Sequence, residues 1–420
     1  MASEWQQVSL GDLIEFTRDG EWGNDQPCQD RLEMLVVRGT DFARLRLGTL
    51  TEIPRRFIDR TAAERKQLRA GDVVIETAGG TKDQSTGRTA LVKQSHLERA
   101  GLPITCASFA RFLRFDRGKV DPGFMYWWLQ SLYASGEMET HQVQHTGVAR
   151  FQFTKFVENT EAPVPPLLEQ RAIAHILGTL DDKIELNRRV NETLEAMARA
   201  IFKSWFVDFD PVRTKAKGPG LPKPIADLFP DRFEDSELGE IPEGWRVAAL
   251  VELATIQGGK QLPTEECMPV GTFPVFGANG VMGYAERTTH AEFVIAFGRV
   301  GAYCGSVHWT YSGAWINNNA SSVVPSRWPE FVLQSMLGTD FVGMRTGSAQ
   351  PFIPNSSLAS LQVVRPPDEV LDAFCSLVRP LRLMEQGSQK QSRTLAALRD
   401  TLLPKLISGE IRVKYMEQCR

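Results

Sequence analysis

The stretch TLDDKIELNRRVNETLEAM, residues 179–197, contains no proline or glycine and reads as one continuous helix. It lies within a longer series of positions that alternate spacings of four and three: Ile173, Leu177, Leu180, Ile184, Asn187, Asn191, Leu194, Ala198, Ile201 and Trp205. Such spacing makes a narrow apolar seam that a partner helix must cover. At 1.5 Å per residue, a helix from Pro166 to Val207 would extend roughly 60 Å, which no single compact domain needs.

Two asparagines interrupt this seam. Asn187 and Asn191 stand where the spacing asks for leucine. An Asn in an apolar seam costs stability, but one that faces another Asn or a Gln fixes the register and the partner. The same side chains could instead point to solvent at the edge of the seam. The sequence leaves their direction open.

The chain repeats itself, and the helix has a counterpart in the second copy. TLEAM begins at Thr193 and TLAAL at Thr394, an offset of 201 residues. Further upstream the offset grows: Val74 matches Val294 at 220, and Trp5 matches Trp245 at 240. Collinear matches at a slowly drifting offset predict an internal duplication.

The second helix is expected to be less regular. Pro380 would remove a backbone hydrogen bond and clash with the preceding turn, so we expect a kink or a restart there. Gly387 weakens the helix further. From Gln389 onward the pattern is clean, with one apolar face formed by Leu395, Leu398, Leu402 and Leu406. The natural partner of each helix is the other one, packed antiparallel.

The predicted fold class is α+β: two mixed α/β domains separated by two long antiparallel helices, with a pseudo-twofold internal repeat. Each copy begins with short, glycine-punctuated strand signals, such as GDVVIETAGG at 71–80. The segment between the copies is rich in Pro, Gly and charge, which is typical of a linker. The predicted parts are a first domain at 1–165, a first helix at 166–208, a linker at 209–240, a second domain at 241–366, a second helix at 367–408 and a C-terminal tail at 409–420.

Composition limits the classes of protein that fit. With 42% hydrophobic residues, the chain can build real cores. No apolar run reaches the roughly 18 residues of a membrane helix, and the N-terminus lacks the pattern of a secretory signal. We therefore expect a cytoplasmic protein without a membrane partner. The six cysteines show no metal-ligand spacing, so no metal site is predicted.

No catalytic site is predicted. IQGGKQ at 256–261 lacks the first glycine and the Ser or Thr of a phosphate-binding loop. FGANGVMGY at 276–284 is followed by no helical pattern, so it is not a dinucleotide fingerprint. DFDP at 208–211 only superficially suggests a base methyltransferase, because no glycine-rich cofactor loop precedes it. A self-sufficient methyltransferase is thus disfavoured.

Polar, glycine-containing loops are the remaining candidates for function. AGGTKDQSTGRT at 78–89 and GRVGAYCG at 298–305 contain arginines, and WINNNASS at 315–322 contains three asparagines. Arg reads guanine edges bidentately, whereas Asn or Gln reads adenine. The window from Lys82 to Lys119 holds eight basic and three acidic residues, a net of five positive charges. That window is a candidate phosphate-contacting face, although a solvated basic surface explains it equally well.

The combined pattern resembles the DNA-specificity subunit of type I restriction-modification systems. The resemblance is carried by the long helical stretch from Pro165 to Val212, by LFPDRFEDSELGEIPEGW at 228–245, by PVFGANGVMGY at 274–284 and by LRDTLLPKLISGEI at 398–411. It implies two target-recognition domains that each read one half of a split double-stranded DNA sequence. It also implies two methyltransferase (modification) subunits that carry S-adenosylmethionine, and restriction/translocase subunits that use ATP and Mg. This chain itself would hold no cofactor.

The resemblance places candidate DNA-contacting residues in the matching loops. They are Gly79, Gly80, Thr81, Lys82, Ser85, Arg88, Thr146 and Arg150 in the first domain, and Asn279, Gly280, Arg299, Gly301, Tyr303, Thr346 and Gln350 in the second. The predicted helix seam comprises Leu177, Leu180, Ile184, Asn187, Asn191, Leu194, Ile201, Leu395, Leu398 and Leu402. A structural adaptor with repeated protein- or glycan-binding domains and oligomerising helices remains the alternative.

Overall fold

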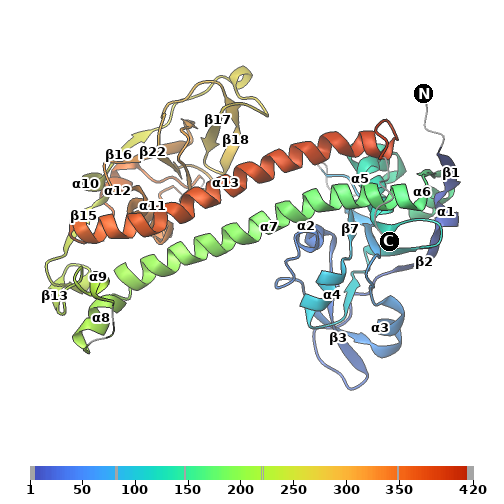
Figure 1. Cartoon of the computed structure of the whole chain (residues 1–420), viewed down its shortest axis with the longest axis horizontal. Helices are drawn as coiled ribbons and strands as arrows, with labels where there is room; N and C mark the ends of the chain where they lie inside the picture. Colours follow the sequence, from blue (N-terminus) through green and yellow to red (C-terminus); the bar gives the residue numbers. More distant parts are fainter. Residues whose placement is uncertain are drawn as a thin grey trace, which may run out of the picture. The chain divides into compact units, whose positions relative to one another are not determined.

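The chain forms two compact units. The computed structural model describes residues 5–80, 84–145, 148–218, 220, 222–347 and 350–413. Unit 1 comprises Met1–Asn187 together with Gln391–Arg420, and unit 2 comprises Arg188–Lys390 (Figure 1). The chain therefore returns to unit 1 after it has completed unit 2.

Unit 1 is built on a four-stranded antiparallel sheet in the order β2-β9-β5-β7. Its central strand β5 reads VVIE, and Val73, Val74 and Ile75 have no exposed surface, because both faces of the strand are covered. A three-stranded sheet, β4-β3-β8, contains one parallel pair, β3 with β8. The strands of unit 1 are β1 (Gln6–Ser9), β2 (Ile14–Asp19), β3 (Arg31–Val37), β4 (Arg55–Asp59), β5 (Val73–Glu76), β6 (Ala78–Gly80), β7 (Thr89–Leu91), β8 (Ile104–Cys106), β9 (Ala110–Phe115), β10 (Gln142–His145), β11 (Val148–Phe151) and β12 (Glu161–Val164).

Short helices cover these sheets. The best-buried is α5, which begins with Asp121 as its N-cap, since the Asp121 carboxylate accepts from the Phe124 N–H at 3.1 Å. Phe124, Trp127 and Leu129 of α5 lie in the core of unit 1. The helices of unit 1 before the long one are α1 (Leu10–Leu13), α2 (Phe42–Arg46), α3 (Arg60–Lys66), α4 (Gln94–Ala100), α5 (Pro122–Ala134) and α6 (Phe153–Asn159).

Unit 2 repeats the strand order of unit 1. Its four-stranded sheet is β16-β22-β19-β20, and its three-stranded sheet, β18-β17-β21, again contains one parallel pair. The pair β15 with β23 repeats the pair β1 with β12. The predicted internal repeat is thus confirmed. The strands of unit 2 are β13 (Phe233–Ser236), β14 (Gly239–Pro242), β15 (Arg246–Ala249), β16 (Ala254–Gly258), β17 (Phe273–Gly277), β18 (Gly280–Ala285), β19 (Val294–Gly298), β20 (Val307–Thr310), β21 (Trp315–Ile316), β22 (Ala320–Pro325) and β23 (Gln362–Arg365).

Two long helices complete the fold: α7 (Leu167–Phe206) and α13 (Asp368–Ile407), each of 40 residues. In unit 1 the core includes Ile173 and Leu177 of α7 with Leu403 and Leu406 of α13. Further along, Asn187 meets Gln391. The residue numbers of the partners on α13 decrease as the residue numbers on α7 increase. The helices therefore pair antiparallel in unit 1, as predicted.

One predicted seam residue departs from the pattern. Leu398 is 46% exposed, whereas its neighbour Arg399 has a side chain that is only 14% exposed. Arg399 takes the inner position because its guanidinium pairs with Asp181 of α7. The other predicted seam positions of α7 and α13 are buried or half-buried.

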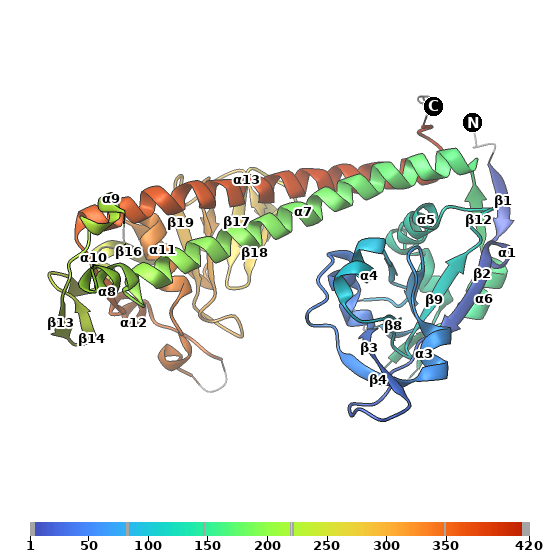
Figure 2. The same ribbon diagram turned by 60° about the horizontal axis from the view of Figure 1, so that its bottom comes forward.

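The expected restart at Pro380 does not occur. Figure 2 shows α13 as one uninterrupted helix, and its helical assignment continues through Pro380 and Gly387. Pro380 is exposed, and so is Ser376, whose carbonyl loses its N–H donor to the proline. Water can therefore satisfy that carbonyl, which lets the helix continue.

The segment expected to be a linker is largely structured. It contains α8 (Asp210–Ala216), α9 (Lys223–Ala226) and the hairpin of β13 and β14. Phe209, Val212 and Phe229 of this segment are buried in the core of unit 2. The average composition is that of a linker, but these three apolar side chains anchor it. The remaining helices of unit 2 are α10 (Leu250–Leu253), α11 (Pro329–Leu337) and α12 (Asn355–Ala359).

Candidate nucleic-acid interface

Arg299 in unit 2 follows directly after β19, and the main chain orients its guanidinium. Nε and Nη2 donate to the Asn318 carbonyl at 3.1 and 2.9 Å, and Cζ lies 5.7 Å from the centre of the Phe352 ring. Within the described part of the chain, Nη1 has no hydrogen-bond partner. An oriented guanidinium with a free N–H face is suited to donate to a base edge or a phosphate.

Two further loops of unit 2 meet beside Arg299. The Gly301 N–H donates to the Pro351 carbonyl at 2.9 Å, and Gly301 has a positive φ of 84°. The N–H and the hydroxyl of Thr346 both donate to the Phe352 carbonyl, at 2.8 and 2.9 Å. Tyr303 is 53% exposed, and Gln350 is also exposed. These loops thus present polar side chains on one surface.

The turn between β17 and β18 joins the same group of loops. Asn279 is exposed at this turn. Gly280 has a positive φ of 95°, and a Cβ at this position would lie 3.1 Å from Cε1 of the His308 ring. The Ser306 hydroxyl donates to the Ala278 carbonyl, which ties the turn to the loop after β19. The structure therefore brings together the predicted residues of unit 2: Asn279, Gly280, Arg299, Gly301, Tyr303, Thr346 and Gln350.

Sequence reasoning missed one segment of this group, Gly258–Gln261. The Asn318 side-chain amide donates to Gln261 Oε1 at 2.5 Å. A Cβ on Gly259 would lie 2.1 Å from the Asn317 carbonyl oxygen, so only glycine fits there. The signal was present as the paired glycines of IQGGKQ, but the sequence alone suggested only a failed phosphate-binding loop.

In unit 1 the predicted glycines lie on β6. Gly80 pairs with Ala149 of β11, and Gly79 is exposed with φ +130°. Arg150, opposite Ala78, is exposed as well. Ser85 offers its carbonyl to the Tyr133 hydroxyl at 3.2 Å. The predictions for Thr81, Lys82 and Thr146 lie outside the described residues.

Arg88, a predicted base reader, is already engaged within unit 1. Its Nε and Nη2 donate to the Glu76 carboxylate at 2.9 and 2.6 Å, and Glu76 is 2% exposed. The hydrogen bond to Glu76 raises the pKa of Arg88 above its ordinary value. Because a bidentate pair occupies the fork of the guanidinium, Arg88 in this arrangement supports the loop from beneath.

The basic window predicted between Lys82 and Lys119 is mostly neutralised by carboxylates, five of which lie outside the window. Of its seven described basic residues, six form ion pairs: Arg88 with Glu76, Lys93 with Asp182, Arg99 with Glu185, Arg111 with Asp19, Arg114 with Asp72, and Lys119 with Asp116. The seventh, Arg117, donates to the Ala70 carbonyl. A count of local charge therefore overstated the positive face of this window.

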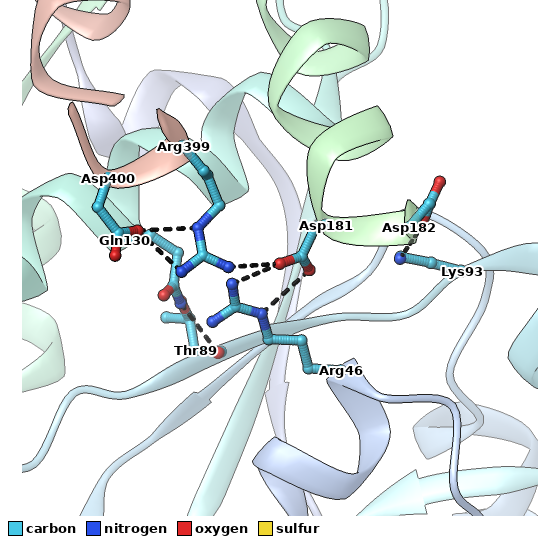
Figure 3. Close-up of polar contacts among 8 residues, drawn as sticks. All are labelled: Arg46, Thr89, Lys93, Gln130, Asp181, Asp182, Arg399 and Asp400. Carbon is cyan, nitrogen blue, oxygen red and sulfur yellow. Dashed lines mark hydrogen bonds and ion pairs between the residues drawn. The ribbon is translucent and has the colours of Figure 1, made fainter. Parts of the chain in front are cut away.

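The helix seam of unit 1 contains a buried polar junction that the spacing did not predict (Figure 3). Asp181 is 8% exposed and accepts from Arg46 Nε at 3.0 Å, Arg46 Nη2 at 2.6 Å and Arg399 Nη1 at 2.7 Å. Burial alone would raise the pKa of Asp181, but the two guanidinium groups outweigh it and hold the pKa below its ordinary value. The junction fastens α2, α7 and α13 at one point.

The two seam asparagines differ. Asn187 is 3% exposed, and its Nδ2 donates to Gln391 Oε1 at 2.9 Å and to the Ser392 hydroxyl at 3.2 Å. It therefore faces the seam and pairs with a Gln. Asn191, in unit 2, is half-buried, and its Oδ1 is buried without a partner among the residues that the structure describes.

None of the helices in the described ranges is long and apolar enough to cross a membrane. No group of three or more His, Cys, Asp or Glu side chains is arranged to hold a metal ion within those ranges.

Comparison with known proteins connects these features to one family. The sequence pattern of the Type I restriction modification DNA specificity domain matches residues 2–196. The type I restriction enzyme MjaIX specificity subunit of Methanocaldococcus jannaschii is 26% identical over 293 residues, which cover 62% of this chain and 62% of that relative. The HindI specificity subunit of Haemophilus influenzae is 26% identical over 328 residues, 61% of this chain and 70% of that relative.

A solved structure supports the fold. The S subunit of a type I restriction-modification system from M. genitalium has a TM-score of 0.60 to this chain at 16% sequence identity. The match covers 98% of this chain and 97% of that structure. At this identity, the likeness concerns the fold alone.

Proposed function

Because the chain belongs to the specificity subunits of type I restriction-modification systems, we propose that it is a non-catalytic subunit that recognises a bipartite, asymmetric DNA sequence. The observation that carries this proposal is the duplication of one fold with unlike loops. Unit 2 presents Arg299, Asn279 and Tyr303, whereas unit 1 presents Gly79 and Arg150 at the related edge. Two domains that share one fold but present different polar side chains are suited to read two different half-sites.

The proposed partners supply the chemistry that this chain would direct. Two methyltransferase subunits would carry S-adenosylmethionine and modify adenine, and restriction/translocase subunits would use ATP and Mg. This chain would contribute sequence recognition to both activities and hold no cofactor itself.

We further propose that the paired helices set the number of unread base pairs between the half-sites. Asn187 paired with Gln391, and Asp181 paired with Arg399, resist sliding of α7 along α13, because a slip would leave buried polar groups unpaired. Inserting one heptad into each helix, after Asn187 and before Gln391, adds about 10 Å. At 3.4 Å per base pair, that insertion should lengthen the spacer by about three base pairs.

A domain exchange tests whether each unit recognises its own half-site independently of the other. Residues 1–165 are replaced by the corresponding part of another specificity subunit, and the complex with modification subunits is assayed by methylation sequencing. The expected result is that one half-site changes while the other half-site and the spacer are retained. A change in both half-sites, or no sequence-specific methylation by the unexchanged complex, would refute the proposal.

A structural adaptor remains the second candidate, and the neutralised basic window of unit 1 favours it. An adaptor would bind DNA without sequence preference or not at all. Substituting Arg299 and Arg150 by alanine distinguishes the two candidates, since both arginines are outside the ion pairs of that window. For a DNA reader, selection from a pool of randomised duplexes should relax at different half-sites in the two variants; for an adaptor, neither variant should change the selected sequences.

A further inference from the structure

The two units make the same turn at equivalent positions after their first long strand. In unit 2, Gly259 donates to the Ala320 carbonyl at 2.9 Å and Lys260 donates to the Ile316 carbonyl at 2.8 Å. In unit 1, Gly20 donates to the Ala110 carbonyl at 3.0 Å, and Glu21 donates to the Cys106 carbonyl at 2.8 Å. The turns of β16 and β2 are thus superposable in their hydrogen bonding.

A close approach of the backbone enforces glycine in both turns. A Cβ on Gly259 would stand 2.1 Å from the Asn317 carbonyl oxygen, and one on Gly20 would stand 1.9 Å from the Cys106 carbonyl oxygen. Each glycine therefore presses its turn against the loop that precedes β22 or β9. In unit 2 that loop contains Asn318, whose carbonyl holds Arg299.

The residue that follows the glycine has opposite charge in the two units. Glu21 in unit 1 pairs with Lys66, Oε2 to Nζ, at 2.7 Å. Lys260 in unit 2 is exposed and has no ion-pair partner in the ranges that the structure describes. Its backbone is fixed on both sides, since its carbonyl also accepts from the Trp315 indole N–H at 2.8 Å. A fixed backbone with an unpaired ammonium is suited to a phosphate contact.

Gln261 connects the turn to the predicted recognition loops. Its Oε1 accepts from the Asn318 amide, and Arg299 is bound to the Asn318 carbonyl. The hydrogen bonds from Arg299 to Asn318 and from Asn318 to Gln261 both lie at the exposed surface of unit 2. Arg287, whose Cζ lies 4.8 Å from the centre of the Trp315 ring, is paired with Glu266. The free positive charge near the turn thus comes from Lys260 and Arg299.

We propose that the Gly258–Gln261 turn is a DNA-contacting segment of unit 2. Lys260 binds a backbone phosphate, and Gln261, steered by Asn318, donates to and accepts from a base edge in the same half-site. Unit 1 has no phosphate contact at the equivalent turn, because Glu21 stands there. This inference rests on the proposed function. It adds two residues, both in unit 2, to those that contact the half-site read by unit 2.

The phosphate contact is tested with K260A in the full chain reconstituted with modification subunits. The matched control is K223A, which removes one exposed lysine of α9 and the same unit of charge. For K260A, affinity for the target and for unrelated duplexes should fall together, and the slope of log affinity against log salt should become shallower by about one. K223A should leave both unchanged.

The base contact is tested with Q261A. The expected result is relaxed selection at one or two positions of a single half-site, with a cost of about 10-fold or more for the original base there. Thermal unfolding of each variant separates loss of contact from loss of folding.

The outcomes distinguish this inference from the function on which it rests. If the wild-type complex selects no bipartite sequence, the proposed function fails. If the wild type selects one, but K260A matches K223A in salt slope and Q261A retains the full base preference, the inference about the turn is overturned.

Discussion

The same pair of helices makes buried polar contacts beside its apolar packing in unit 1, and aromatic contacts in unit 2. In unit 1, Asp181 pairs with Arg399 and Asn187 bonds to Gln391. In unit 2, Phe206 of α7 packs on Phe374 of α13 with ring centres 4.9 Å apart. Apolar packing is strong but tolerates sliding, whereas buried hydrogen bonds fix a register. Apolar and aromatic packing thus stabilises both parts of the seam, and the polar contacts of unit 1 also fix the register.

The largest effect is expected from the aromatic half. Phe374→Ala removes a fully buried ring that contacts Phe202, Trp205 and Phe206. The free energy of unfolding should fall by about 3–5 kcal/mol, measured by denaturant titration. Leu377→Ala on the same helix is the control, because Leu377 is 50% exposed and its loss should cost about 0.5 kcal/mol or less. Equal effects at the two positions would contradict the aromatic role.

The next effect is expected at the polar junction. Asp181→Asn removes the charge that compensates Arg46 and Arg399, so two partly buried guanidinium groups lose their counter-ion. The expected loss is about 3 kcal/mol. The adjacent Asp182→Asn is the matched control, since the Asp182 side chain is 63% exposed and its pair with Lys93 should be worth at most about 1 kcal/mol. A mild effect at Asp181 would mean that the junction is not a fastening point.

The stabilisation by Asp181 should also depend on pH. Its pKa is held below the ordinary aspartate value by Arg46 and Arg399. A carboxyl whose pKa is lower in the folded state stabilises the fold above its unfolded pKa, and this contribution is lost as the pH falls through the folded pKa. The difference in stability between wild type and Asp181→Asn should therefore be constant near neutral pH and shrink in acid. A constant difference down to the acid transition would be inconsistent with the low pKa.

The smallest effect on stability, and the most specific one, is expected at Asn187. Asn187→Leu fills the seam with an apolar side chain, and its partner Gln391 is exposed and can bond to water. The free energy of unfolding should change by less than about 1 kcal/mol. The spacer between half-sites should nevertheless become less uniform, which methylation sequencing would show as a second spacer length. A single unchanged spacer length would mean that Asn187 does not fix the register of α7 against α13.

Periodicity and repetition predicted what depends on local pattern. The alternating spacing around Asn187 placed α7 within two residues of its observed ends, and the repeat offset predicted a second helix and a second copy of the sheet order. The sequence left open whether Asn187 faces the seam or solvent, and the structure shows that it faces the seam and bonds to Gln391.

Features that depend on distant partners were not predictable. Asp181 reads as an ordinary exposed helix residue until Arg46, 135 positions away, and Arg399 are placed beside it. The same effect removed the apparent charge of the Lys82–Lys119 window, whose counter-ions include Asp19 and Asp72. The sequence of the Gly258–Gln261 turn resembles only an incomplete phosphate-binding loop, because the need for glycine at Gly259 comes from the Asn317 carbonyl, which no local pattern reveals.

The sharing of each long helix between the units has a consequence for protein synthesis. The core of unit 1 includes Leu403 and Leu406, which the ribosome adds after all of unit 2, whereas the core of unit 2 ends with Val378. Unit 1 therefore has to wait for a segment that is made after unit 2 before its core is complete. Domains usually finish in the order in which they are translated; in this protein the first unit to begin is the last to close.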